Sequence, residues 1–212
     1  MPKDLPLMSL ATDMVIFNIR NFQLHILLVQ RKTEPFTGSW CLPGGIVYPD
    51  MTVEGTAYKV LYKETGLVPK YMKQFAVFAD IHRDPRARVV GIGYYTIICD
   101  NDLIPQSGQT QLNAMFVPLT DIPALAFDHD IVRKQAYKQL QKDIEGSDIV
   151  KYFLPKLFTL DLLKQYCEVV YGRTFEKRNF IKYITSRFKI QKTKHKEQYV
   201  AHRPAALYKF VA

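Results

Sequence analysis

The sequence predicts an α+β protein of two domains, a strand-rich domain at residues 1–146 and a smaller helical domain at residues 147–212. Three observations support this fold class. Apolar and β-branched runs with a few helices fill most of the first domain, which is the pattern of helices packed on a sheet. Helical periodicity dominates the second domain, and the turn-forming residues Glu145-Gly146-Ser147 separate the two. All of the excess positive charge lies after that turn.

The strands of the first domain are predicted from apolar runs between turn residues. Residues 14–19 and 24–30 flank Asn21 and Phe22, which indicates a β-hairpin. Three further strands are rich in aromatic and β-branched side chains and are predicted at residues 74–81, 88–99 and 114–118.

Two helices are predicted in the same domain. The first covers residues 52–65 and ends at Gly66, because glycine readily adopts the left-handed conformation that closes many helices. The second begins after Asp128, whose side chain is expected to cap it, and continues to about Asp143.

The second domain has the outline of a winged helix-turn-helix. Thr159 is expected to cap a helix whose apolar residues recur at helical spacing until Gly172. After a short turn, a second and basic helix is predicted at residues 175–186. Strands at residues 188–193 and 206–210, joined by a polar loop at 194–203, complete the predicted wing.

The charge distribution separates the two domains. Residues 1–146 contain 15 Lys and Arg against 15 Asp and Glu, whereas residues 147–212 contain 14 against 5, so the net charge of +9 belongs to the second domain. A basic module attached to a neutral one is typical of proteins that bind a polyanion such as nucleic acid. The alternative is a basic surface that is only solvated.

The composition excludes several classes of protein. The longest apolar run, residues 89–99, is too short to span a bilayer and is interrupted by glycines. Because a signal-peptide pattern is also missing, a cytoplasmic location is expected. Cys41, Cys99 and Cys167 lack the spacing of a zinc site or a disulfide framework and are expected to be buried free thiols. We expect no cofactor.

The motif Leu42-Pro43-Gly44-Gly45, followed by a predicted helix and by Glu64-Thr65-Gly66-Leu67, resembles the signature of the Nudix family. That signature has a glycine, five residues, a glutamate, seven residues, and then Arg-Glu-aliphatic-any-Glu-Glu-any-Gly-aliphatic. Counted from Gly45, the spacing to Gly66 and Leu67 fits without a gap. The resemblance implies a Nudix-like α/β sandwich for the first domain. The chemistry of that family is metal-assisted hydrolysis of a diphosphate bond.

The carboxylates of the signature are largely replaced. Met51 stands at the position of the first glutamate, Lys59 at that of the arginine, and Val60 at that of the glutamate after it. Of the adjacent glutamate pair, the first is Lys63, and only Glu64 is kept. One carboxylate beside an ammonium group does not supply the oxygen ligands that magnesium needs. We therefore expect no metal site, no catalytic residue and no Nudix hydrolysis.

A degenerate Nudix domain joined to a basic winged helix resembles the Nudix-related transcriptional regulators, which include repressors of NAD metabolism and regulators of pentose use. Five further stretches match that group in order along the chain, at residues 82–90, 126–129, 154–160, 176–180 and 203–208. The resemblance implies a DNA-binding regulator, specifically a repressor, that works as a homodimer. Its effector would be ADP-ribose or a related nucleotide, or a pentose or its phosphate.

The candidate effector residues lie around the glycine motif and in one charged loop. Arginine side chains bind phosphate and carboxylate oxygens through two N–H groups at once. Trp40 is expected either to stack on a ligand or to belong to the core. For the charged loop, the alternative is a structural network of ion pairs. The predicted effector residues are Arg31, Glu34, Trp40, Lys63, Arg83, Asp84, Arg86 and Arg88.

The second helix of the winged domain is expected to enter the major groove of DNA, where Arg178 suits guanine and Asn179 suits adenine. Lysines of the wing are expected to contact phosphates. The predicted DNA-binding residues are Lys177, Arg178, Asn179, Lys182, Lys192, Lys194, Lys196 and Arg203. A two-fold dimer would prefer a pseudo-palindromic operator.

Two alternative functions stay open at this point. One is an active Nudix hydrolase of nucleoside diphosphate derivatives with an appended nucleic-acid-binding module. The other is an RNA-binding adaptor without a regulatory role.

Overall fold

A computed structural model describes residues 7–100, 103–105, 111–198 and 204–211 of the chain. Strands β1 (Ser9–Arg20) and β2 (Gln23–Arg31) form a long antiparallel hairpin. Asn21 and Phe22 form its turn, and both have positive φ, as in the tight turns that match the twist of paired strands. The predicted hairpin is therefore confirmed, with longer strands.

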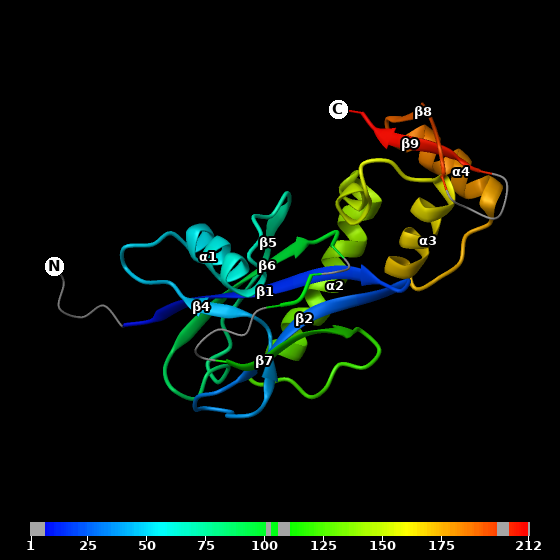
Figure 1. Ribbon diagram of the computed structural model, residues 1–212. Helices are drawn as coiled ribbons and strands as arrows, with labels where there is room; N and C mark the ends of the chain where they lie inside the picture. The colour runs from blue at the N-terminus through cyan, green and yellow to red at the C-terminus, as the bar shows by residue number, and fades with distance from the viewer. Residues whose placement is uncertain (1–6, 101–102, 106–110, 199–203, 212) are drawn as a thin grey trace.

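The hairpin is the centre of a seven-stranded mixed sheet (Figure 1). β1 pairs in parallel with β6 (Val89–Ile97), and β6 pairs antiparallel with β5 (Met72–Phe78). β2 pairs antiparallel with both β3 (Trp40–Cys41) and β7 (Gln111–Pro118). β4 (Gly44–Ile46) pairs antiparallel with β1.

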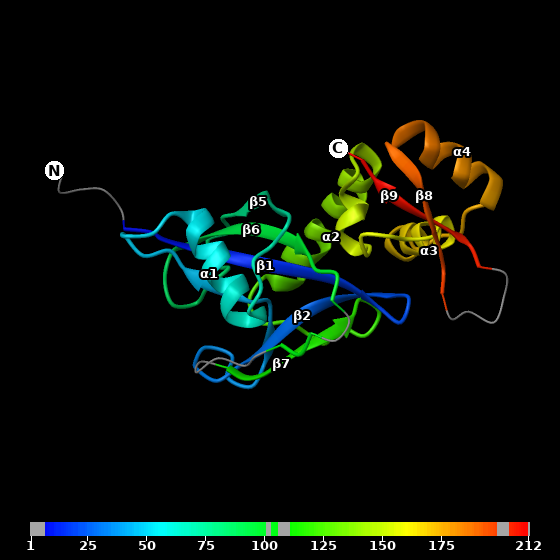
Figure 2. The ribbon, with the colours of Figure 1, turned by 45° about the horizontal axis from the view of Figure 1, so that its top comes forward.

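Two helices, α1 (Val53–Thr65) and α2 (His129–Gly146), cover opposite faces of this sheet (Figures 1 and 2). Successive side chains along a strand point to opposite faces of the sheet, and those of β1 therefore alternate between the two faces. Met14 packs in the cluster with α1, and Val15 packs in the cluster with α2. A strand covered on both faces accounts for the nearly unbroken apolar run in β1.

The two helices begin differently. The Thr52 hydroxyl caps α1 by accepting a hydrogen bond from the amide of Gly55, and α1 ends at Gly66 with φ 68°, as predicted. The predicted cap of α2 is wrong, because the Asp128 side chain makes no capping hydrogen bond. Its carboxylate is bound to another side chain, described below.

The second domain begins with a short 3-10 helix, η1 (Ile149–Phe153). Helix α3 (Leu160–Tyr171) is capped by Thr159, whose hydroxyl accepts from the amide of Leu162, and ends at Gly172 with φ 63°. Both ends agree with the sequence pattern. Glycine suits the C-terminal end of α3, at Gly172, because it adopts this left-handed conformation without strain.

Helix α4 (Lys177–Arg187) begins two residues later than predicted. The reason is Glu176, whose carboxylate accepts hydrogen bonds from the amides of Arg178 and Asn179 at 2.9 and 2.8 Å and so fixes the start of the helix. Strands β8 (Ile190–Lys196) and β9 (Ala206–Phe210) form the wing. β8 extends into the segment predicted as a loop.

One continuous hydrophobic cluster joins the two domains. Leu140 of α2, Val150 of η1 and Leu163 of α3 all belong to it. The tip of the β1–β2 hairpin reaches the second domain as well, because the rings of Phe22 and Tyr166 meet edge to face at 6.3 Å. The winged domain is therefore packed against the first domain at two places.

Several expectations differ from the structure in detail. β5 lies at residues 72–78 instead of 74–81, and β7 starts three residues earlier than predicted. β3, β4 and η1 were not predicted. Cys41 and Cys167 are buried, but Cys99 is exposed, which corrects the expectation of three buried thiols. Within the described part of the chain, no helix has the length and hydropathy that crossing a bilayer would require.

Candidate functional site

A cavity of about 310 Å³ opens beside Gly44 and Gly45 of β4, between β1, β2 and the loop that follows β5. The glycine motif shapes one wall. β4 runs so close to β1 that a Cβ atom on Gly44 would lie 2.7 Å from the carbonyl oxygen of Thr12. Because no side chain fits at that distance, only glycine permits this pairing.

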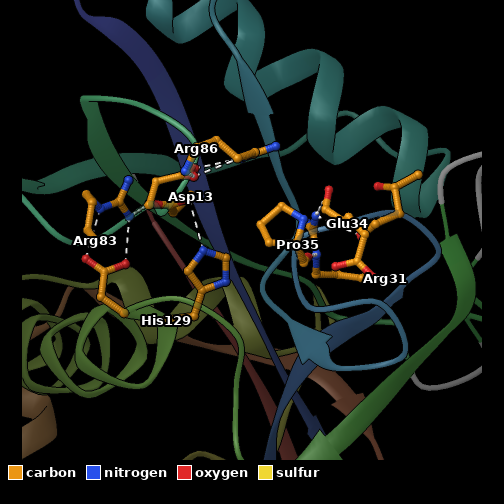
Figure 3. A network of polar contacts seen from close by, with 10 residues as sticks. Asp13, Arg31, Glu34, Pro35, Arg83, Arg86 and His129 are labelled. Carbon is orange, nitrogen blue, oxygen red and sulfur yellow. Dashed lines mark hydrogen bonds and ion pairs between the residues drawn. The ribbon is translucent and has the colours of Figure 1, made fainter.

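Arg83 joins two carboxylates at the floor of the cavity (Figure 3). Its Nη2 lies 2.6 Å from Oδ2 of Asp13 on β1. Its Nε and Nη2 lie 2.9 and 2.8 Å from the two oxygens of Asp128, just before α2. The exposed fractions of the Arg83, Asp13 and Asp128 side chains are 4%, 6% and 14%. Such charges are tolerated away from water only when they are paired and hydrogen-bonded.

Gly91 on β6 makes room for this network. A Cβ atom at that position would lie 2.6 Å from both Arg83 Cζ and Asp13 Oδ2. A larger residue would therefore push the guanidinium away from its carboxylates.

His129, the first residue of α2, adds a third contact to the network. Its Nε2 lies 3.4 Å from Oδ1 of Asp13, and its Nδ1 accepts a hydrogen bond from the amide of Leu42 at 2.9 Å. Burial lowers the pKa of His129, but the hydrogen bond with Asp13 and the charge of Asp13 outweigh burial and raise the pKa to about 9. The amide of Leu42 opposes this shift. Protonation would place a second N–H opposite the amide of Leu42. The neutral ring with its proton on Nε2 is the form that fits this geometry.

Asp13 is ionised in this setting. Burial alone would raise its pKa, but the hydrogen bond from His129 and the charge of Arg83 together hold the pKa below the ordinary value.

A second ion pair also lines the cavity. Arg86 donates to both oxygens of Asp84 at 2.9 and 2.6 Å. These hydrogen bonds also lower the pKa of Asp84, against the effect of burial.

Positive side chains surround the opening of the cavity. Arg31 lies with its Cζ 4.9 Å from the centre of the Phe127 ring, and Arg86 lies 5.6 Å from the same ring. Arg31 Nε also donates to the carbonyl of Pro35 at 2.7 Å, which fixes the loop after β2 (Figure 3). Lys63 reaches the cavity from α1 and pairs with Glu64 at 3.6 Å.

Five of the eight predicted effector residues line this cavity, namely Arg31, Lys63, Arg83, Asp84 and Arg86. Three others lie outside its lining. Glu34 is exposed on the loop after β2. Trp40 packs against the hydrophobic core, which is the alternative stated for it above. Arg88 donates to the carbonyls of Ala79 and Asp80, both at 2.9 Å.

The lining residues that sequence reasoning missed include Asp13, Phe127 and His129. Asp13 could have been found, because a carboxylate inside an apolar strand needs a buried partner. His129 follows the residue that the sequence predicts as a helix cap, and nothing near it in sequence points to Asp13. Phe127 has φ 58°, a conformation that the sequence does not reveal.

The helix face that carries the Nudix signature is mostly closed to the cavity. Val60 is buried, and the Glu64 side chain is only 2% exposed. Gln111 donates to Glu64 Oε1 at 2.7 Å, while Oε2 has no hydrogen-bond partner in the described structure. Burial raises the pKa of Glu64, although Gln111 and Lys63 oppose it. In the described ranges, no three His, Cys, Asp or Glu side chains gather closely enough to hold a metal ion.

A second charged surface lies on α4 and β8, at the end of the molecule far from α1 in both views (Figures 1 and 2). Seven of the eight predicted DNA-binding side chains are exposed there: Lys177, Arg178, Asn179, Lys182, Lys192, Lys194 and Lys196. Lys177 pairs with Asp161 of α3 at 2.8 Å. Arg203 lies outside the described residues.

Comparison with known proteins finds matches in both parts of the chain. Residues 10–140 match the NUDIX domain, and residues 150–210 match the NrtR DNA-binding winged helix domain. The chain is 31% identical over 211 residues to the ADPR responsive transcriptional repressor NtrR of Acinetobacter baylyi. This similarity covers 98% of the chain and 84% of that relative.

Two of the solved structures that are similar to this chain come from one protein. The NrtR of Shewanella oneidensis in complex with a 27mer DNA is 29% identical, with a TM-score of 0.80 over 95% of this chain and 93% of that one. The NUDIX domain of the same protein in complex with ADP ribose is 33% identical. Its TM-score is 0.60, and the match covers 66% of this chain and 93% of that one.

Proposed function

The chain belongs to the Nudix family, within its group of Nudix-related transcriptional regulators, and on that premise we propose that it is an ADP-ribose-responsive repressor of transcription. The cavity of the first domain binds the effector, and the winged helix binds double-stranded operator DNA. We assign residues 1–146 to the effector-binding domain and residues 147–212 to the DNA-binding domain.

The observation that carries the choice of effector is the charge of the cavity. Four cationic side chains but only two carboxylates line the cavity, because Asp128 and Glu64, which pair with Arg83 and Lys63, lie outside the lining. A positive excess therefore faces the space inside. This excess complements the diphosphate of ADP-ribose through charge-assisted hydrogen bonds. A neutral pentose would offer these cations hydroxyl acceptors but no negative charge. The names of the relatives, one ADPR responsive and one bound to ADP ribose, support the same choice.

The residues at the Nudix signature do not fit a magnesium site. Magnesium requires several oxygen ligands in near-octahedral geometry, whereas Val60 offers none and the Lys63 ammonium group repels the ion. Glu64, the carboxylate that is kept, is buried behind the cavity lining. The proposed protein therefore binds its ligand without hydrolysing it.

The assembly and location follow from the proposed role. Two copies related by a two-fold axis would present identical recognition helices to the halves of a pseudo-palindromic operator. We propose such a homodimer. A repressor acts at the chromosome, and so we propose a cytoplasmic location.

The test uses the full chain, ADP-ribose and a fluorescent DNA duplex selected by this protein from a random pool. Calorimetry should show ADP-ribose binding without magnesium, and ribose 5-phosphate should bind at least tenfold more weakly. Saturating ADP-ribose should change the affinity for the duplex about fivefold or more, the range typical of allosteric coupling. Absence of ADP-ribose binding would overturn the proposed effector.

The same protein separates the alternatives. Hydrolysis of ADP-ribose with magnesium or manganese near 1 per second, an ordinary enzymatic rate, would favour the hydrolase. Tighter binding to a duplex RNA of the same sequence than to the DNA would favour the RNA-binding adaptor.

A further inference from the structure

The start of α2 is built into the floor of the effector cavity. Three consecutive residues there face it or its ion pairs. Phe127 lines the cavity and has a left-handed backbone at φ 58°, which a non-glycine residue keeps only when its surroundings hold it. Asp128 binds Arg83, and His129 binds Asp13 and the amide of Leu42.

The middle and later turns of α2 are fastened to the winged helix domain. Tyr137 Oη and Gln141 Nε2 donate to the carbonyl of Val170 on α3 at 2.8 and 3.0 Å. In return, Tyr171 Oη donates to the carbonyl of Gln141 at 3.4 Å. The buried residues of α2 and α3 also share one hydrophobic cluster. Tyr137 and Gln141 lie 8 and 12 residues beyond His129, so α2 rises roughly 12 to 18 Å between these two attachments.

Arg83 stands between the cavity and this helix. Its guanidinium lines the cavity and divides its hydrogen bonds between Asp13 on the sheet and Asp128 at the start of α2. An anionic ligand in the cavity competes with both carboxylates for the same cation. Because Asp128 belongs to the segment that leads into α2, any change in its bond to Arg83 acts on the helix.

We propose that the Asp128–Arg83 pair couples effector binding to DNA binding through α2, with Asp128 as the positioning residue. The inference rests on the proposed function above and adds the route by which that site controls the winged helix. Coupling requires an element whose position both sites influence. α2 meets this requirement, because its first residues border the cavity and its later turns hold α3.

The test variant is Asp128→Asn, which removes the charge from the pair and keeps the size of the side chain. It leaves Arg83 bound to Asp13, and it removes no helix cap, because Asp128 caps nothing. The matched control is Asp130→Asn. Asp130 lies two residues further along α2, is 41% exposed, and pairs with Arg133 and Lys134 away from the cavity.

The measured quantity is the ratio of the Kd values for the selected DNA duplex with and without saturating ADP-ribose. Asp128→Asn should keep effector-free DNA affinity and ADP-ribose affinity within about threefold of wild type, but bring the ratio close to one. Asp130→Asn should keep the wild-type ratio, and Asp128→Glu should restore part of it. A purely structural role would weaken binding of the two ligands without changing this ratio.

Each result decides the matter. If Asp128→Asn keeps the wild-type ratio, the coupling route is overturned while the proposed function stands. If wild type itself shows no response to ADP-ribose, the proposed function fails, and the route fails with it.

A second measurement is needed if Asp128→Asn does not fold. In wild-type protein, ADP-ribose should then change hydrogen exchange at the α2–α3 contacts, and unchanged exchange there would overturn the route.

Discussion

The carboxylate of Asp128 receives hydrogen bonds from the guanidinium of Arg83 at 2.9 and 2.8 Å, and none from the first turn of α2. The same guanidinium holds Asp13 at 2.6 Å. One buried cation thus satisfies a carboxylate on the central strand and another at the start of a helix. The sheet and α2 are joined by an ion pair at the floor of the cavity.

Replacing Arg83 by alanine should destabilise the protein strongly. Asp13 would stay buried without its cation, and breaking a buried ion pair from one side costs about 3–5 kcal/mol. The free energy of unfolding, measured with urea at pH 7, should fall by that amount. The matched control is Arg88→Ala in the same loop, whose guanidinium binds only backbone carbonyls at the surface. Its cost should be about 1 kcal/mol. Equal losses of unfolding free energy for the two variants would show that the buried ion pairs of Arg83 stabilise the fold no more than the surface hydrogen bonds of Arg88.

The stability of the network should depend on pH. The folded-state pKa of Asp13 lies below its ordinary value, so its ion pair stabilises the fold fully above the unfolded pKa, near 3.9. That contribution is lost as the pH falls through the folded pKa. The difference in unfolding free energy between wild type and Asp13→Asn should therefore be largest at neutral pH and shrink below about pH 4. A difference that stays constant down to pH 2 would contradict this assignment.

Glu64 should behave in the opposite way. Burial raises its pKa, so the fold binds a proton at Glu64 more tightly than the unfolded chain does. At neutral pH the buried carboxylate costs stability, and the cost disappears as the pH falls below the folded pKa. Glu64→Gln removes the charge and keeps an acceptor for Gln111. It should raise the free energy of unfolding at pH 7 by about 1 kcal/mol. A loss of stability would show that the ionised carboxylate is needed.

Much of the fold was predictable because its signals are local. The hairpin turn at Asn21 and Phe22, the glycine that ends α1 and the threonine that caps α3 all act within a few residues. β3 and β4 have only two and three residues, and each exists through its pairing with a strand distant in sequence. Periodicity cannot reveal such strands.

The site was predictable in part for the same reason. The charged loop with Arg83 and Arg86 stands out in the sequence, but the partners of Arg83 lie 70 and 45 residues away. Asp128 precedes a helix, and local chemistry therefore predicts a cap. The buried guanidinium of Arg83 competes with that role and wins, because an unpaired buried charge costs more than a missing cap.

Arg86 should contribute to effector binding without a role in DNA binding. Its side chain is 49% exposed at the cavity, and Asp84 orients its guanidinium. Arg86→Ala should weaken ADP-ribose binding about tenfold or more, since a charge-assisted hydrogen bond contributes roughly 1.5–3 kcal/mol. Affinity for DNA without effector should stay within about twofold. Calorimetry and fluorescence anisotropy measure the two quantities, with Arg88→Ala as the control. Loss of effector-free DNA binding in a folded Arg86→Ala protein would refute this division of roles.

The recognition helix and the wing should contribute differently to DNA binding. Arg178 and Asn179 are exposed at the start of α4, where side chains of a winged helix reach base edges. Replacing either by alanine should cost about 1–3 kcal/mol per half-site on the selected duplex and much less on a scrambled one. The lysines of β8 should act on both duplexes alike.

The lysines of the wing provide the contrasting test. Lys192 and Lys194 are exposed on β8, and the excess positive charge of the chain lies in the same domain. Each phosphate that a lysine neutralises contributes about −0.9 to the slope of log affinity against log salt concentration. Lys192→Ala or Lys194→Ala should therefore make the slope shallower by about one and weaken selected and scrambled duplexes equally. The control is Lys59→Ala on α1, at the far end of the molecule, which should leave both affinity and slope unchanged (Figure 1). Anisotropy titrations at four or more salt concentrations measure the affinity for the selected duplex, the affinity for the scrambled duplex and the salt slope.

If Arg178→Ala and Asn179→Ala also weaken both duplexes equally, α4 contacts only the phosphate backbone. The sequence preference must then come from the wing or from the shape of the DNA.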